Sequence, residues 1–152
     1  MATTRLIRLI RAPRAAVYRA LLNADAVQYW MVPDNMTSQV HSFDARQGGT
    51  FRISLTYDDP TLAGKTSARI DTFHGRFAEL VPNTRVVQKV EFETDDPQLQ
   101  GEMTITYELT EVTGGTEVFG LHEGLPAGVS PADNELGWNM SMDKLAKLVE
   151  GQ

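Results

Sequence analysis

The stretch SPADNELGWNMSMDKLAKLVE, residues 130–150, decides the fold because it predicts one long amphipathic helix. Ser130 is a good N-cap residue, and Pro131 suits the first turn, where its missing N–H costs nothing. Asp133 stands where the acid of a capping box would stand. An apolar stripe recurs at intervals of four, three and four residues: Trp138, Met142, Leu145 and Val149. One face of this helix is therefore expected to be buried and the rest to face water.

Upstream of this helix, apolar and polar residues alternate, which predicts strands with one buried face. The alternation is clear over residues 51–57, 86–92 and 103–109. Phe73 and Phe77 indicate another, shorter strand. Gly48-Gly49 and Gly114-Gly115 lie between strand-like runs and indicate tight hairpin turns. No crossover helix separates these strands, so the sequence predicts an antiparallel sheet of six or seven strands.

The first third of the chain predicts a strand followed by two short helices. Residues 3–12 fit either a helix or a strand, and we interpret them as a strand. Pro13 suits the first position of a helix, and Asp25 suits the N-cap of a second helix that ends at Pro33. A long helix after an antiparallel meander should lie across the sheet, which gives an α+β fold. We expect one domain over residues 1–152.

Composition excludes several classes of function. The 152 residues contain no cysteine, so disulfides, thiolate nucleophiles and cysteine-ligated metals are excluded. Lys and Arg number 14 against 20 Asp and Glu, a net charge of −6, which disfavours binding to nucleic acid. No apolar run is long enough to predict membrane insertion. Arg5, Arg8 and Arg11 interrupt any signal-peptide core, so we expect a cytoplasmic protein.

The motifs between these elements resemble one known family. Their order is similar to that of the START-like (SRPBCC) superfamily, in the branch of homologues of the activator of heat-shock protein 90 ATPase. The residues that carry the resemblance are Ala12-Pro13, Tyr29-Trp30, Asp44-Ala45-Arg46-Gln47-Gly48-Gly49, Gly75 with Glu79, Gly115-Thr116 and Gly137-Trp138. This chain departs from the branch at Tyr29, where a second tryptophan is usual, and in a longer loop over residues 58–72.

The resemblance implies a helix-grip fold, in which a curved antiparallel sheet wraps the C-terminal helix around a largely apolar cavity. A small hydrophobic molecule would bind there, and Gln88, His122 and the hydroxyls of Tyr57 and Tyr107 would orient it. An aromatic residue on an alternating strand also fits ordinary core packing, and so does a hydrogen-bonded Gln88 or His122. The remaining candidate ligand-binding residues are Trp30, Phe43, Phe51, Ile53, Leu55, Phe73, Phe77, Val90, Phe92, Met103, Ile105, Trp138 and Met142.

Sequence motifs for catalysis, metals and cofactors are not found. His41, His74 and His122 lie 33 and 48 residues apart without metal-ligand spacing, and no serine stands in a nucleophile motif. We therefore predict no catalytic residue, no metal and no cofactor. Glu79 with Arg76 or Arg85 is expected to form a structural charge pair.

The strand near residue 120 predicts two apolar faces. Val118, Gly120 and His122 share one face, while Phe119 and Leu121 share the other. Either the assignment of the faces is wrong or something covers the outer face. A second copy of the chain is one candidate, because exposed apolar patches often mark interfaces.

Three functions remain open from the sequence. Binding of a small hydrophobic ligand is favoured, since apolar positions dominate the inward faces of the strands. The superfamily also implies an enzyme of the cyclase or hydrolase type, with His122 as the base and Tyr107 or Gln88 polarising a carbonyl. The branch implies a stress-related co-chaperone with a chaperone as its partner. We rank these hypotheses in that order.

Overall fold

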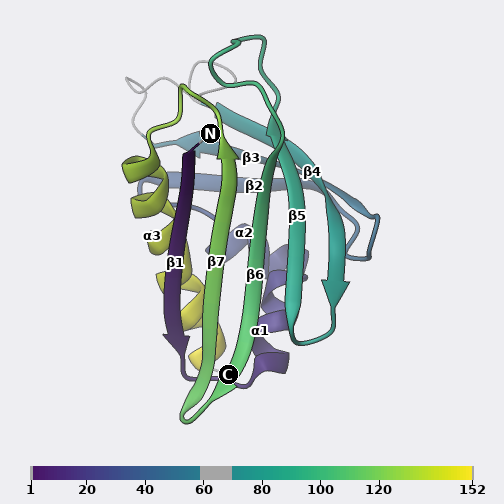
Figure 1. Cartoon of the computed structure of the whole chain (residues 1–152), viewed down its shortest axis with the longest axis vertical. Helices are drawn as coiled ribbons and strands as arrows, with labels where there is room; N and C mark the ends of the chain where they lie inside the picture. Colours follow the sequence, from purple (N-terminus) through teal and green to yellow (C-terminus); the bar gives the residue numbers. More distant parts are fainter. Residues whose placement is uncertain (1, 59–69, 152) are drawn as a thin grey trace.

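The computed structural model describes residues 2–58 and 70–151, which form seven strands and three helices. Figure 1 shows their arrangement. In chain order the elements are β1 (Ala2–Ile10), α1 (Arg14–Leu21), α2 (Ala24–Trp30), β2 (Met36–Phe43), β3 (Thr50–Tyr57), β4 (Ile70–Val81), β5 (Arg85–Phe92), β6 (Met103–Val112), β7 (Gly115–Leu125) and α3 (Pro131–Glu150).

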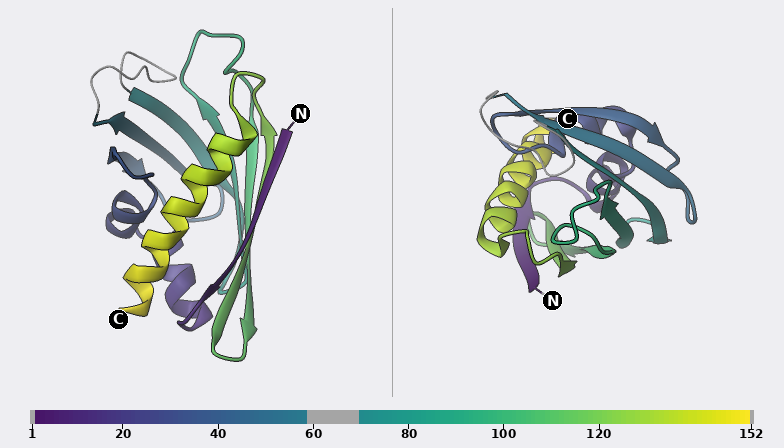
Figure 2. Two further views of the ribbon diagram at one scale, coloured as in Figure 1. Left: turned by 90° about the vertical axis from the view of Figure 1, so that its left-hand side faces the viewer. Right: turned by 90° about the horizontal axis from the view of Figure 1, so that it is seen from above.

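The strands form one antiparallel sheet in the order β1-β7-β6-β5-β4-β3-β2. Every neighbouring pair except β1 and β7 is consecutive in the chain, as expected for strands joined by hairpins and short loops. Figures 1 and 2 show the sheet bending around α3, which packs against β1, α1 and α2. The α+β helix-grip architecture predicted from the sequence is confirmed.

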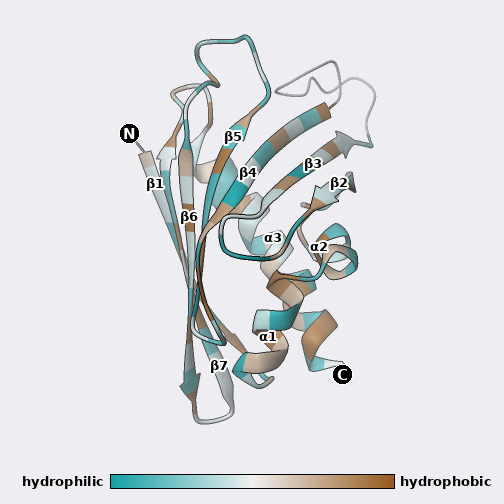
Figure 3. Ribbon diagram, turned by 90° about the vertical axis from the view of Figure 1, so that its right-hand side faces the viewer, coloured by the Kyte–Doolittle hydropathy of each residue, from teal (hydrophilic) through white to brown (hydrophobic). Residues whose placement is uncertain are grey.

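The core lies between the concave face of the sheet and the three helices. Alternate residues of most strands point into it, as along β5 and β7. Figure 3 shows hydrophobic and hydrophilic residues interspersed along the sheet that bends around the helices. The side chains in the core that are almost inaccessible to water include Ile10, Val17, Trp30, Ile53, Phe77, Val86, Val118, Met142 and Leu145.

The helix termini follow from local sequence. The Ser130 side chain accepts a hydrogen bond from the Asp133 amide, and Pro131 occupies the first turn of α3, as predicted. Two details differ. Pro13 is the N-cap of α1 rather than its first residue. The N-cap of α2 is Asn23, whose Oδ1 accepts from the Ala26 amide, and Asp25 instead lies inside the first turn.

Some strands differ from the sequence-based expectation. β1 confirms the strand interpretation for the N-terminal segment. β4 is twelve residues long, well beyond the short strand around Phe73 and Phe77. β2 is an additional edge strand that the sequence pattern does not delimit. Most of the long loop expected over residues 58–72 lies outside the described residues. No helix in the described ranges is both long and apolar enough to cross a bilayer.

Candidate functional site

A row of four residues crosses the concave face of the sheet, and three of the four have polar side chains. We call it the polar row. Strand register places these residues side by side on β5, β6, β7 and β1: Gln88, Ile105, His122 and Thr4. Gln88 is 3 % exposed, His122 8 % and Thr4 4 %. Three polar side chains therefore lie inside a core that is otherwise largely apolar, where an unpaired polar group costs free energy.

His122 is held in one orientation by α3 and β6. Its Nδ1 lies 3.2 Å from Nδ2 of Asn134, and that amide also donates a 2.9 Å hydrogen bond to Thr4 Oγ1. Nδ1 is therefore the acceptor, and the imidazole proton is on Nε2, 3.2 Å from the sulfur of Met103. Burial lowers the pKa of His122 to about 4, so the ring is neutral at physiological pH.

The hydroxyl of Tyr107 lies in the next row of the same face. Tyr107 is opposite Val86 on β5 and Gly120 on β7. The indole Nε1 of Trp138 donates to this hydroxyl at 3.0 Å. Burial raises the pKa of Tyr107 to about 12, against the opposing effect of that hydrogen bond, so the hydroxyl keeps its proton.

The Gln88 amide differs from the other polar groups of this face. No side-chain hydrogen bond joins it to another of the described residues, although the residue is 3 % exposed. An amide can make up to four hydrogen bonds, so its capacity remains unused within this part of the chain. Gln88 and Tyr107 are inward polar residues of adjacent rows, and together they could bind the polar end of a small molecule. Both ring nitrogens of His122 are already occupied by protein partners.

Trp138 occupies much of the space between α3 and β7. Its ring makes edge-to-face contacts with Tyr107 and His122, with centroid distances of 5.8 and 5.9 Å. A Cβ added at Gly120 would lie only 2.7 Å from two of its ring carbons. Side chains therefore fill the position above Gly120, where the resemblance implies a hollow. The indole remains half-buried and lies at the edge of the core.

The other residues predicted to line a cavity are buried or half-buried. Phe43, Phe51 and Phe77 form an aromatic cluster with centroid distances of 5.1–6.2 Å. Trp30 donates its indole N–H to the Ala20 carbonyl at 2.9 Å and packs as core. Among the rest, Ile53, Val90, Met103 and Met142 are buried, while Leu55, Tyr57, Phe73, Phe92 and Ile105 are half-buried.

Sequence analysis missed two residues of this site, Asn134 and Thr4. Asn134 lies four residues before Trp138, on the same face of α3, and this spacing is the signal that could have indicated it. Thr4 lies on the inward phase of β1, next to His122. Asn134 hydrogen-bonds to the histidine ring, and Thr4 accepts a hydrogen bond from the same amide. These contacts hold the ring in place and do not indicate a ligand.

Charged side chains gather on the opposite, convex face of the sheet. Arg52 makes a bidentate pair with Glu93, and His74 lies 2.9 Å from Glu91 and 3.1 Å from Glu93. A hollow of about 250 Å³ adjoins His74 on this face. The described residues contain no group of three or more histidine or acidic side chains suited to a metal ion.

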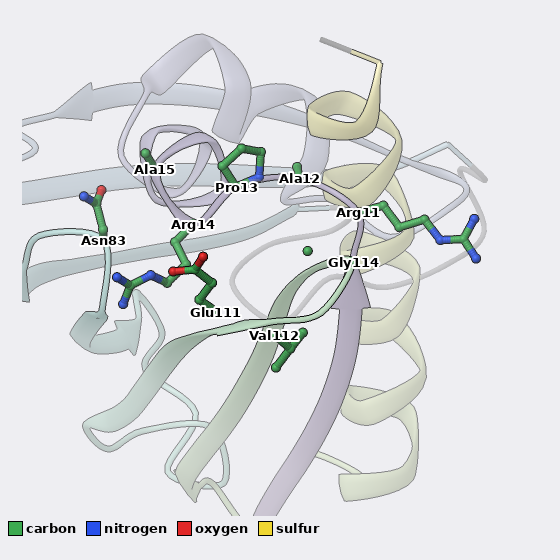
Figure 4. Close-up of a pocket in the computed structure, with 10 residues that line it drawn as sticks. Arg11, Ala12, Pro13, Arg14, Ala15, Asn83, Glu111, Val112 and Gly114 are labelled. Carbon is green, nitrogen blue, oxygen red and sulfur yellow. The ribbon is translucent and has the colours of Figure 1, made fainter.

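A second hollow, of about 530 Å³, lies at the end of the sheet near the start of α1. The β1–α1 connection, the β6–β7 hairpin and Asn83 line it (Figure 4). Arg14 and Glu111 lie at its rim, while the Arg11 side chain points away. This hollow is separate from the polar row.

Comparison with protein families gives one match over most of the chain. The family described as Activator of Hsp90 ATPase homolog 1-like protein matches residues 11–150. The chain belongs to this family. The resemblance inferred from the motifs is thereby confirmed. A comparison with curated proteins finds no match to the chain.

Solved structures of other AHSA1-like and related proteins share the fold. A protein from Chromobacterium violaceum is 34 % identical, with a TM-score of 0.87, and the match covers 97 % of this chain and 96 % of that one. An AHSA1-like protein from Aeromonas hydrophila is 18 % identical, with a TM-score of 0.73 and coverage of 99 % and 93 %. A Mesorhizobium loti protein is 18 % identical, with a TM-score of 0.75 and coverage of 99 % and 98 %.

Proposed function

We propose that this AHSA1-like domain binds a small, largely apolar molecule that carries one hydrogen-bonding group. The polar group of the ligand would pair with the Gln88 amide, and its apolar body would replace Trp138 against the sheet. The single observation that carries the proposal is that Gln88, a residue only 3 % exposed on the concave face, makes no side-chain hydrogen bond with another described residue. A hydrogen bond from this amide to a ligand would contribute about 0.5–1.5 kcal/mol to binding.

In this proposal, the Trp138 side chain moves when the ligand binds. Its indole is half-buried at the edge of the core, and one hydrogen bond ties it to Tyr107. Outward rotation of the side chain would open the space above Gly120, next to Ile105 on the polar row. Binding would then be driven by apolar area, at about 25 cal/mol per Å², with the polar row selecting the orientation.

A matched pair of probes tests the proposal directly. 1-Naphthol and naphthalene differ by one hydroxyl, so titration calorimetry with both isolates the hydrogen bond. We expect 1-naphthol to bind roughly tenfold more tightly to the wild-type chain. Gln88→Leu should remove that preference and leave naphthalene binding in place. Thr106→Val, on the convex face of β6, is the matched control and should keep the preference.

Two results would overturn the binding proposal. The first is no binding of either probe up to its solubility limit. The second is an unchanged preference for 1-naphthol in a folded Gln88→Leu variant.

The position of His122 favours binding over proton transfer. A general base works best when its pKa lies near the working pH, whereas burial lowers that of His122 to about 4. Both ring nitrogens also have partners, in Asn134 and Met103. The cyclase or hydrolase hypothesis therefore has less support than ligand binding.

The co-chaperone hypothesis rests on the description of the family, which refers to the Hsp90 ATPase. It stays a prediction for this chain. An ATPase assay of an Hsp90 from the same source, with and without the chain, tests it. Stimulation that survives Gln88→Leu would separate this activity from ligand binding in the core.

A further inference from the structure

The convex face of the sheet has two halves of different character. On β3 to β6, cationic side chains have partners: Arg52 with Glu93, Arg76 with Glu102, Arg85 with Glu79 and Glu108, and Lys89 with Thr104. The distances run from 2.7 to 3.2 Å. This half is a network of ion pairs and hydrogen bonds suited to contact with water.

The other half, on β1 and β7, is apolar at its centre. Ile7 is 69 % exposed and Leu9 48 %, both on the outward phase of β1. Phe119 lies directly opposite Ile7, and Leu121 follows on the same face of β7. No helix lies over this part of the sheet in Figure 1. We call the set the outer strip, which consists of Arg5, Ile7, Leu9, Glu117, Phe119 and Leu121.

The outer strip ends in two opposite charges. Arg5 is opposite Leu121 at one end, and Glu117 is opposite Leu9 at the other. They are about 13 Å apart along the strand direction, too far for an ion pair within one chain. Neither forms an ion pair with another residue in the described ranges. These two side chains therefore contrast with the paired charges of β3 to β6.

We propose that a second copy of this chain covers the outer strip in a two-fold symmetric dimer. A two-fold axis that passes the Ile7–Phe119 pair, lies in the plane between the two sheets and runs perpendicular to the strands reverses the direction of the strip. Arg5 and Glu117 each lie two residues from that pair, in opposite directions. The axis therefore brings Arg5 of each copy to the Glu117 end of the other, which makes two equivalent ion pairs around an apolar centre.

The charges favour a second copy over a membrane surface as the occupant. An anionic bilayer attracts faces with an excess of basic residues. The outer strip instead carries one charge of each sign, Glu123 lies beyond it on β7, and the chain has a net charge of −6. Self-complementary charge is what an isologous interface requires, because the same patch must fit itself.

Sedimentation velocity of the full chain over micromolar to submillimolar concentrations tests the dimer. We expect a concentration-dependent species with about twice the 16.8 kDa mass of the chain. Ile7→Lys should return the chain to a monomer at every concentration. Leu136→Lys is the matched control, since Leu136 is 59 % exposed on α3, on the other side of the sheet, and this variant should still dimerise. Circular dichroism checks that both variants fold.

Charge reversal tests the arrangement independently of the apolar residues. Arg5→Glu and Glu117→Arg should each weaken association at least tenfold, because each places like charges together. The double variant should associate like the wild-type chain, since its ion pairs re-form in the opposite sense. A wild-type chain that stays monomeric, or a dimer insensitive to Ile7→Lys, would overturn the proposal. Single reversals that the double variant does not rescue would also overturn it.

Discussion

The indole of Trp138 on α3 donates a 3.0 Å hydrogen bond to the hydroxyl of Tyr107 on β6, and the two rings meet edge to face. This contact joins the C-terminal helix to the concave face of the sheet. It also occupies the space that a ligand would need. The same pair therefore stabilises the unliganded fold and determines how a ligand would enter.

The coupling between these two side chains should be measurable. Tyr107→Phe leaves the indole N–H without its acceptor, and Trp138→Phe leaves a buried hydroxyl without its donor. We expect each change to lower the free energy of unfolding by about 1–3 kcal/mol. The double variant should lose about 1 kcal/mol less than the sum of the two, as urea unfolding would show. Strict additivity would contradict a direct interaction.

Two glycines should respond to alanine in opposite directions. At Gly120 the new methyl group would lie 2.7 Å from the Trp138 ring, so Gly120→Ala should destabilise the fold by about 1–3 kcal/mol. At Gly137, inside α3, the methyl group would meet Pro33 at 3.4 Å, an ordinary contact. Gly137→Ala should therefore stabilise the chain by up to about 1 kcal/mol. Urea unfolding followed by circular dichroism measures both, and equal signs would contradict the packing described for Trp138.

The sequence predicts the elements with regular periodicity and fails where the period is broken. The stripe from Trp138 to Val149 correctly places the buried face of α3. β2 is less clear because a bulge between Val40 and Ser42 interrupts the alternation at His41. The alternation of apolar and polar residues indicates which residues of a strand point inward. After a bulge, the alternation continues with the opposite set of positions.

The site was only partly predictable for a different physical reason. The alternation along β5 is enough to place Gln88 in the core. β7 has apolar residues on both faces, so its alternation leaves the phase of His122 open, and only the register with β6 settles it. How a core is filled depends on contacts between distant segments. The Trp138 ring takes the space above Gly120 because glycine leaves room there, and Asn134 reaches His122 because of how α3 crosses the sheet. A residue pattern specifies neither relationship.

The pKa of Glu93 should depend on Arg52. Hydrogen bonds from Arg52 lower the pKa of the Glu93 carboxyl, and His74 adds to this against the effect of burial. Arg52→Met should therefore raise the pKa of Glu93, which carbon-detected NMR titration of the glutamate carboxyls can follow. The free energy of unfolding should change little, since Arg52 and Glu93 form a surface ion pair. Arg76→Met removes the separate pair with Glu102 and should leave the pKa of Glu93 unchanged.

His122 should make the fold less stable in mild acid. Burial lowers its pKa from 6.5 to about 4 in the folded chain, so the unfolded chain binds the proton first as the pH falls. The stability that the chain gains by burying His122 as a neutral ring is fully present above pH 6.5. It is lost progressively as the pH falls to about 4. The shift corresponds to roughly 3 kcal/mol of unfolding free energy across that window. Protonated Nδ1 would also face the amide of Asn134 as donor against donor.

Comparison with His122→Gln isolates this effect from the carboxylates, which titrate in both chains. Urea unfolding at a series of pH values between 7 and 4 gives the free energy of unfolding for each chain. The wild-type chain should lose more stability than the variant, and the difference should develop mainly below pH 6.5 and level off near pH 4. Parallel curves would show that His122 has similar pKa values in the folded and unfolded chains, which its burial between Met103 and Asn134 would not allow.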